Sequence, residues 1–339
     1  MEFKAYHKIR QFKDIVRDIQ FKSNFKGLDK DGQPIYQETE KPILTFTATT
    51  KLHGTNAGIC YKPKEGIVAQ KRGSLIPKDD LAAHFGFNQF VQVEKKLFFT
   101  DLMEELYTKH CKFGEQITIY GEWAGNGIQK SVGISELPKG FYIFDCKVYD
   151  VEKDTQRWLD ISAWEFDTDK VFNINEFPTW TLDIDFNKPA LSQNKMVEIT
   201  EQIEKDCPVA KQLGITTNNV GEGAVWTCYW NDEKHIFKVK GNAHSVSRVK
   251  KLASVDPEVV NSIHEFVEYA CTPNRIEQGI QEVNATEKRD MPALLKWVAN
   301  DIITEETDTL VSNNLEWKQV AGNCSNKVRQ YFFAKIDKV

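Results

Sequence analysis

The stretch Lys51-Leu52-His53-Gly54-Thr55-Asn56 joins two segments with the pattern of β-strands. Before it, residues 42–49 alternate apolar and hydroxyl side chains, which is typical of a half-buried strand. Gly54 allows a turn or the close approach of a ligand, and residues 57–61 resume as a second strand. The sequence therefore predicts a lysine that is fixed at the end of a strand, directly before a turn.

A lysine in such a place has two possible roles. Apolar neighbours lower the pKa of an amine by desolvation, and the free lone pair is then a nucleophile. The simpler alternative is that Lys51 is a solvated residue of the turn. The hexapeptide alone leaves both open, so the decision depends on the rest of the chain.

The composition is that of an ordinary globular protein. The 339 residues suggest two domains, and 41% of them are hydrophobic while 27% are charged. Residues 1–8 carry charges and lack an apolar signal segment, and no later run approaches the ~18 apolar residues that span a bilayer. Seven widely spaced cysteines form no Cys-x-x-Cys pair. We expect a cytoplasmic protein with reduced thiols, without a zinc site or a disulfide framework.

Charge is distributed unevenly along the chain. The formal net charge is −5, and residues 151–206 carry 13 acidic against 6 basic side chains. Residues 234–255 carry only basic side chains, at Lys234, Lys238, Lys240, Arg248, Lys250 and Lys251. A local basic surface on an acidic protein suits a polyanion bound at one place, although an ordinary solvated face has the same composition.

Four further segments carry candidate site residues. Arg72 lies in a basic turn after a short strand and offers a planar fork for phosphate, or is a surface residue of the turn. Glu122 and Glu222 each lie between glycines at a strand end, where a ligand can come close. In residues 140–148, alternation puts Phe144 and Asp145 on opposite faces unless a bulge intervenes.

The run Ile236–Lys240 alternates so that Lys238 and Lys240 project from one face. Two lysines on one face repel each other unless an anion lies between them. This pair is therefore more informative than either lysine alone.

Helical patterns lie on both sides of these strands. Residues 12–19 form an amphipathic segment, and residues 79–110 have helical spacing with Phe90, Val93, Leu97, Leu102 and Leu106 as expected core positions. After Ser245 the pattern is helical, with start signals at Asp256-Pro257 and Thr272-Pro273 and further segments near 292–305 and 315–337. We expect one domain over residues 1–245 and a separate helical domain over residues 246–339.

The order Lys-x-x-Gly, Gly-Glu, an aromatic strand ending in Asp, Glu-Gly and Lys-x-Lys resembles the covalent nucleotidyltransferase superfamily of ATP-dependent ligases and mRNA capping enzymes. The residues within and around these motifs are similar to those of the phage RNA ligase 2 family, which includes the RNA-editing ligases of kinetoplastids. The stretches that carry this similarity are 51–56, Lys71-Arg72-Gly73 with Ile76-Pro77, 121–130 and 141–145, and residues 266–275 resemble the start of the helical domain of the phage members.

The resemblance implies an α+β fold: a nucleotidyltransferase (ATP-grasp-like ligase) domain of antiparallel sheets with flanking helices, followed by a small all-helical C-terminal domain. It implies an ATP-dependent RNA ligase that seals 5′-phosphate and 3′-hydroxyl ends through lysyl-AMP and RNA-adenylate intermediates in RNA repair. The expected cofactors are ATP, as covalent AMP, and Mg²⁺ or Mn²⁺. The expected partner is RNA, as a nicked duplex or in another form, and we expect a monomer, in an infected host cell if it is phage-encoded.

The resemblance also assigns roles to residues. Lys51 is the nucleophile, Lys238 and Lys240 contact the α-phosphate, and Glu222 serves the metal or holds Lys51. Glu122 binds the ribose hydroxyls and Phe144 stacks on adenine. The nucleotide-binding set is Thr50, Lys51, Leu52, Asn56, Arg72, Glu122, Phe144, Lys238 and Lys240, and the set that contacts RNA ends is His53, Asn56 and Arg72.

One position departs from the family pattern. Members often carry a lysine five residues after the second glutamate, where this chain has Thr227. The alternatives are a capping-type guanylyltransferase or a DNA ligase, which usually append an OB-fold where this chain has a helical tail, or a catalytically silent nucleic-acid-binding module.

Overall fold

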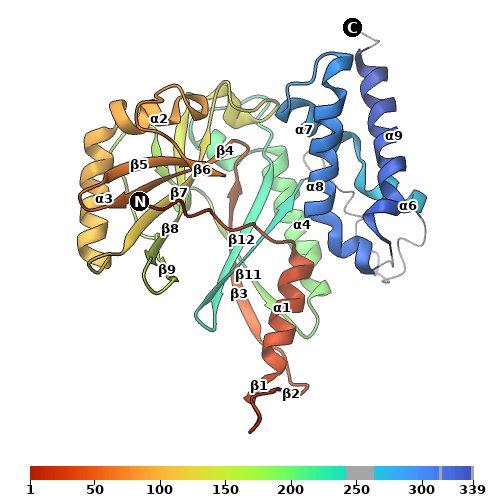
Figure 1. The fold of residues 1–339 in the computed structure, drawn as a ribbon, viewed down its shortest axis with the longest axis horizontal. Helices are drawn as coiled ribbons and strands as arrows, with labels where there is room; N and C mark the ends of the chain where they lie inside the picture. The colour runs from red at the N-terminus through yellow and green to blue at the C-terminus, as the bar shows by residue number, and fades with distance from the viewer. Residues whose placement is uncertain (242–262, 313–314, 337–339) are drawn as a thin grey trace. The chain divides into compact units, whose positions relative to one another are not determined.

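The computed structural model describes residues 1–241, 263–312 and 315–336. The chain divides into two compact units, Met1–Gly241 and Asn242–Val339 (Figure 1). The expected domain boundary at residues 245/246 and the start signal at Asp256-Pro257 lie outside the described residues.

Two β-sheets form the framework of the first unit (Figure 1). The four-stranded sheet has the order β11-β3-β12-β13, and every pairing in it is antiparallel. Its strands are β3 (Ile43–Lys51), β11 (Trp180–Asp185), β12 (Gly223–Trp230) and β13 (Glu233–Lys240).

The seven-stranded sheet has the order β10-β8-β7-β4-β5-β6, with β9 paired to β8. Among the described pairings of this sheet, β10 with β8 is parallel and the others are antiparallel. Its strands are β4 (Thr55–Lys62), β5 (Gly66–Lys71), β6 (Ser74–Leu75), β7 (Gln116–Ala124), β8 (Gly140–Asp150), β9 (Thr155–Leu159) and β10 (Val171–Asn173).

Helices α1 (Phe12–Asn24) and α4 (Ala190–Lys205) pack on one face of the four-stranded sheet. Their buried residues, such as Ile19 and Ile203, meet Phe46, Trp226 and Phe237 of the strands. Because strand side chains alternate between faces, the neighbours of these apolar residues lie on the opposite face. That second face is the one that carries the candidate lysines. The short helix α5 (Pro208–Gln212) follows α4.

The seven-stranded sheet packs against α2 (Phe87–Gln89), a π-helical turn at Phe90–Glu94 and α3 (Lys96–His110). The predicted core positions Val93 and Leu97 are wrong, since their side chains are 58% and 75% exposed. The π turn holds one residue more than an α-helical turn and ends at Lys95, which leaves helical geometry. It therefore shifts the helical phase, and Phe99 and Met103 are fully buried instead.

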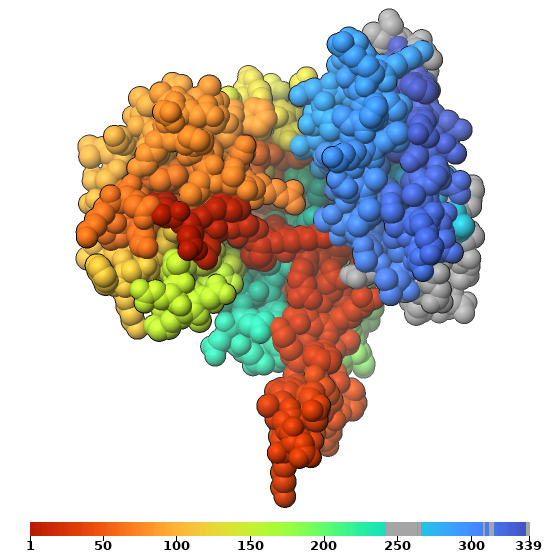
Figure 2. All heavy atoms as spheres, viewed as in Figure 1, coloured from red at the N-terminus to blue at the C-terminus, as the bar shows by residue number. Residues whose placement is uncertain are grey.

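Residues 1–10 run over the surface of the unit (Figure 2). The carbonyl of Lys4 accepts hydrogen bonds from Gln70 Nε2 at 3.1 Å and from Tyr120 Oη at 2.8 Å in the seven-stranded sheet. The carbonyl of Arg10 accepts from the backbone N–H of Lys238 at 3.2 Å in the four-stranded sheet. This N-terminal strap therefore ties both sheets together.

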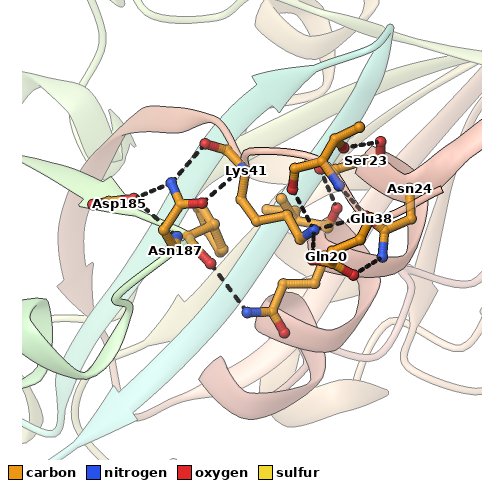
Figure 3. Close-up of polar contacts among 10 residues, drawn as sticks. Gln20, Ser23, Asn24, Glu38, Lys41, Asp185 and Asn187 are labelled. Atoms are coloured by element: carbon orange, nitrogen blue, oxygen red, sulfur yellow. Dashed lines mark hydrogen bonds and ion pairs between the residues drawn. The ribbon is translucent and has the colours of Figure 1, made fainter.

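A polar network fixes the point at which β3 begins (Figure 3). The short strands β1 (Phe25–Leu28) and β2 (Pro34–Tyr36) form a ribbon after α1, and the chain returns from it to Lys41, which is 8% exposed. Lys41 Nζ pairs with Glu38 and donates to Asn24 Oδ1 at 2.7 Å. The backbone of Lys41 exchanges two hydrogen bonds with the side chain of Asn187, at 2.8 and 2.9 Å. Lys51 lies at the other end of this anchored strand.

The second unit is helical in its described part, with α6 (Ile263–Ala270), α7 (Pro273–Glu282), α8 (Met291–Ser312) and α9 (Trp317–Ile336) around one core. The predicted helix start at Thr272-Pro273 is confirmed, because Thr272 Oγ1 accepts from the N–H of Arg275 at 3.3 Å. All seven cysteines are free thiols. No helix among the described residues is both long and apolar enough to cross a membrane.

Candidate active site

Lys51 is the last residue of β3 and lies opposite Gly223, the first residue of β12. This register places Glu222 beside the lysine. Gly223 has φ +151°, and a Cβ there would lie 2.2 Å from the carbonyl oxygen of Val239. Only glycine fits here, because the backbones of β12 and β13 lie so close together at this residue. Gly223 therefore fixes the position of the preceding residue, Glu222, and of its carboxylate.

The carboxylate of Glu222 is the centre of a cluster of side chains that carry nitrogen. Its Oε2 lies 2.8 Å from Lys51 Nζ and 3.3 Å from His53 Nδ1, and its Oε1 lies 2.9 Å from Lys240 Nζ. The Glu222 side chain is 1% exposed, whereas the two lysine side chains are 20% and 16% exposed. One buried anion therefore holds two partly exposed ammonium groups, one on each of its oxygens.

The electrostatics of Glu222 are dominated by these cations. Burial by itself would raise its pKa, but the charges of Lys240 and Lys51, with the hydrogen bond to His53, hold the pKa of Glu222 well below its usual range. The carboxylate is therefore ionised across the physiological pH range.

Lys238 and Lys240 lie on the same face of β13, as the alternation predicts. They pair with Val225 and Gly223 of β12, while Phe237 and Val239, which alternate with them along the strand, belong to the core under α1 and α4. Two lysines on one face need an anion nearby, and Glu222 supplies that anion next to Lys240.

Glu122 lies on β7 in the seven-stranded sheet, and its carboxylate contacts the hexapeptide 51–56. Its Oε1 accepts the backbone N–H of Gly54 at 3.0 Å. Burial raises the pKa of Glu122 to about 7, against the opposing charge of Lys51. Gly54 is required here, because a Cβ would lie 2.4 Å from the carbonyl oxygen of Trp123. The two candidate glutamates thus hold the hexapeptide from both sheets.

Phe144 is the extra residue of a β-bulge. In the β7–β8 pairing Tyr120 lies opposite Asp145, yet the next residue, Gly121, lies opposite Ile143. Simple alternation would separate Phe144 from Asp145, but the bulge lets Tyr6 touch both, with its ring 5.0 Å from that of Phe144 and its hydroxyl 2.6 Å from Asp145 Oδ2. The Phe144 ring is half-buried.

The other predicted residues lie on β3 and β4 and in the segments that follow β3 and β5. Thr50 and Leu52 are buried, at 3% and 6% exposure, and Asn56 lies opposite Glu122 in the β4–β7 pairing. Arg72 is exposed in the turn between β5 and β6 and is not among the side chains that pair with Glu222 in the described part of the chain.

The departure at Thr227 lies on the same sheet face as the lysines. Thr227 pairs with Thr47 of β3 and Ile236 of β13, and its Oγ1 lies 3.4 Å from the carbonyl oxygen of Thr47. A hydroxyl therefore occupies a place where the family pattern has a charge.

Two features of the site were not predicted. Lys234 forms a buried ion pair with Asp145, although alternation along β13 already puts Lys234 on the face of Lys238. His84 Nε2 lies 3.0 Å from the carbonyl oxygen of Asn56, within a turn where residues 84–86 all have positive φ. No sequence signal indicates this strained turn.

The described residues contain no group of three or more His, Cys, Asp or Glu side chains that could hold a metal ion. The donors at the site are the two glutamates, of which Glu222 has both oxygens engaged by lysines. Such a set fits a hard cation that takes most of its ligands from phosphate and water, as Mg²⁺ does beside nucleotides.

Comparisons with known proteins find one family model that matches this part of the chain. A family model described as RNA ligase matches residues 44–240, which include every residue of the cluster. Among solved structures, the chain is similar to the Naegleria gruberi RNA ligase with PPi, at 17% identity and a TM-score of 0.45 over 72% of this chain and 57% of that one. A variant of the same ligase with ATP and Mn matches at 16% identity and a TM-score of 0.44, over 70% and 56%. Each match thus spans less than two thirds of the solved ligase.

Proposed function

The chain belongs to the RNA ligase family, and we propose that it is an ATP-dependent ligase that joins 5′-phosphate and 3′-hydroxyl ends of RNA. The observation that carries the proposal is the pairing of Lys51 and Lys240 with opposite oxygens of Glu222, at 2.8 and 2.9 Å. An amine at a strand end, oriented by a buried carboxylate beside a second ammonium, is the arrangement expected of a nucleophile that attacks a phosphate.

In the first step, the Lys51 Nζ lone pair attacks the α-phosphorus of ATP. Because Lys51 is an ammonium group in its ion pair with Glu222, it first releases one proton to water, which frees this lone pair. The new P–N bond forms as the bond to pyrophosphate breaks, and the nitrogen releases a second proton to water. Glu222 Oε2 is within hydrogen-bond reach of that nitrogen and orients it. Lys240, together with Lys238 on the same strand face, stabilises the charge that develops on the phosphate oxygens.

Two later steps complete the sealing. The 5′-phosphate of an RNA end displaces Lys51 from AMP, which gives the RNA-adenylate, and a 3′-hydroxyl then attacks that phosphate and releases AMP. We assign Arg72, His53 and Asn56 to the RNA ends. Arg72 suits this role because its guanidinium is exposed and forms bidentate contacts with phosphates.

The nucleotide itself would lie between the two sheets. Phe144 offers a half-buried ring for adenine, and Glu122 offers a carboxylate for the ribose hydroxyls. We also assign Thr50 and Leu52, which are buried and flank Lys51 in the sequence, to the nucleotide.

A divalent cation would neutralise phosphate charge in each step. Glu222 is the protein residue that we assign to it. In the unmodified protein Lys51 and Lys240 occupy both oxygens of Glu222. The Lys51 nitrogen loses its positive charge once it is bonded to AMP, so Oε2 is then released from its ion pair. Glu222 accordingly holds Lys51 before the first step and is available to the cation after it.

Covalent labelling tests the proposal. The protein is incubated with Mg²⁺, or with Mn²⁺ in a parallel series, and with ATP or GTP labelled at the α-phosphate, and the denatured chain is examined for label. We expect label from ATP, none after Lys51→Ala, and full label after Lys96→Ala, since Lys96 is exposed on α3. Label from GTP alone would indicate capping chemistry, and absence of label with both nucleotides would refute the ligase. Sealing of a nicked RNA duplex, compared with a nicked DNA duplex and with single strands, then identifies the substrate.

A further inference from the structure

A buried ion pair connects the two sheets of the first unit. Lys234 on β13 of the four-stranded sheet pairs with Asp145 on β8 of the seven-stranded sheet. The two side chains are only 7% and 1% exposed. The N-terminal strap joins this contact, because Tyr6 Oη donates to the other carboxylate oxygen at 2.6 Å.

Aromatic rings surround the ammonium group. Lys234 Nζ lies 4.8 Å from the ring centre of Trp158 and 5.6 Å from that of Tyr229. Such cation–π contacts favour the charged amine in a place with little water. Burial raises the pKa of Asp145, and the charge of Lys234 opposes that rise. Each charge is therefore held by several partners, which is the condition under which a buried pair has one defined geometry.

The position of the pair relates it to the proposed nucleotide site. Asp145 directly follows the bulged Phe144, and Tyr6 contacts both residues. Lys234 lies on the same face of β13 as Lys238 and Lys240. The pair thus connects the strand that carries the proposed adenine platform with the strand that carries the proposed phosphate-binding lysines.

A buried ion pair contributes little net stability compared with apolar residues of the same size, and its best-supported use is to select one arrangement. We propose that Lys234 is a positioning residue for ATP: through Asp145 it fixes the bulge at Phe144 and the separation of β8 from β13. This inference rests on the proposed function, since it assumes that the nucleotide binds between these strands. Lys234 does not pair with Glu222, so it affects ATP affinity rather than the reaction at Lys51.

Lys147 supplies a matched control. It is also a buried lysine, at 3% exposure, and its Nζ lies 3.8 Å from the ring centre of the same Trp158. However, its hydrogen-bond partner Gln156, at 3.2 Å, lies on β9 of its own sheet. Lys147 therefore shares the burial and the ring contact of Lys234 without connecting the two sheets.

The test measures ATP binding to the full chain by calorimetry without divalent metal, so that no chemistry occurs. We expect Lys234→Met to raise the Kd for ATP about tenfold, because the site is no longer preorganised. Lys234→Arg keeps the cation and should remain within about threefold of the wild type, and Lys147→Met within about twofold. The double variant Lys234→Met with Asp145→Asn removes both members of the pair, so neither is left as an unpaired buried charge, and we expect it to fold and to bind ATP as weakly as Lys234→Met.

Adenylylation at saturating ATP supplies the second readout, and its rate in Lys234→Met should stay close to the wild-type rate. An unchanged Kd in a folded double variant would refute the inference, as would an equal loss of affinity in Lys147→Met. A lower rate at saturating ATP with an unchanged Kd would also refute it. If the wild type binds ATP but never labels Lys51, the ligase proposal fails while the Kd series still decides the role of Lys234. If the wild type binds no ATP, both fail.

Discussion

The backbone N–H of Gly54 lies 3.0 Å from Oε1 of Glu122, which joins the loop after Lys51 to the opposite sheet. The nucleophile is therefore held from two directions, by Glu222 through its side chain and by Glu122 through the loop that follows it. A site that is fixed in this way before substrate arrives reacts without first having to be ordered.

Changing Gly54 should disturb this arrangement without unfolding the protein. A Cβ at residue 54 would lie 2.4 Å from the carbonyl oxygen of Trp123 and 2.8 Å from Cβ of Ala124. We expect Gly54→Ala to displace the loop from Glu122 and to slow adenylylation at least ~100-fold. Gly73→Ala is the control, because a Cβ there meets nothing within 4 Å. Equal adenylylation rates in the two variants would show that the loop position is unimportant.

Removing the charge of Glu222 should strongly slow the first step, in which Lys51 becomes adenylylated. In Glu222→Gln the ammonium groups of Lys51 and Lys240 lose their shared anion, and the nucleophile loses its orientation. We expect adenylylation to fall by about 100-fold to 1,000-fold, as when other preorganised charged groups are removed. Glu233→Gln, at an exposed partner of Lys22, should have the wild-type rate. The measurement is the single-turnover rate of label incorporation at pH 7, and a Glu222→Gln rate within tenfold of the wild type would contradict the assignment.

The elevated pKa of Glu122 predicts a stability that falls as pH rises. Its pKa is about 7 in the folded chain and near 4.5 when unfolded. The unfolded chain therefore releases this proton first, and the folded state is penalised progressively from about pH 4.5 through pH 7. After allowance for solvent screening, we expect the unfolding free energy of the wild type, minus that of Glu122→Gln, to fall by ~1–3 kcal/mol between pH 5 and pH 8.

Denaturant titrations of both proteins at several pH values would measure this difference. Glu222 is present in both, so most of its own contribution cancels from the comparison. Parallel stability curves for the two proteins would show that Glu122 titrates at its ordinary pKa.

In the helical unit, Arg275 is the most consequential charged side chain. It is fully buried and pairs with Asp301 at 2.8 Å and with the fully buried Glu306 at 3.1 Å. Arg275→Met should destabilise this unit by ~3–5 kcal/mol, because two carboxylates lose their cation. Arg289→Met, at a side chain that is 79% exposed, should cost less than ~0.5 kcal/mol. Chemical denaturation of the full chain, followed by tryptophan fluorescence, compares the two variants, and equal midpoints would contradict the prediction.

The sequence predicted the residues that regular strands position. The alternation of side chains along a strand predicts the positions of Lys51, Lys238 and Lys240. The glycines beside Glu222 indicate a close approach of the backbones, which brings this carboxylate to the lysines. These features depend on local geometry, which is the same in every strand. The structure accordingly places Lys51, Lys240 and Glu222 together as one cluster, with Lys238 on the same face of β13 as Lys240.

The features that the sequence did not predict occur where the regular strand pattern is interrupted or where distant segments meet. The bulge at Phe144 brings its ring and the Asp145 carboxylate to the same tyrosine, and it has no marker such as a glycine at that residue. The N-terminal strap contacts residues more than one hundred positions away, at Gln116 and Tyr120. Contacts of that kind depend on the topology of the whole fold. The periodicity of a short stretch of sequence carries no information about that topology.

The π-helical turn at Phe90–Glu94 has a consequence for variation in chain length. Its extra residue changes the helical phase, so that Phe99 rather than Leu97 is fully buried near the start of α3. Deleting one residue there would join α2 and α3 into a continuous helix and would leave Phe90 and Phe99 facing the same sheet. This segment is thus one at which the chain could become shorter by a residue while its core and its active site stay in place.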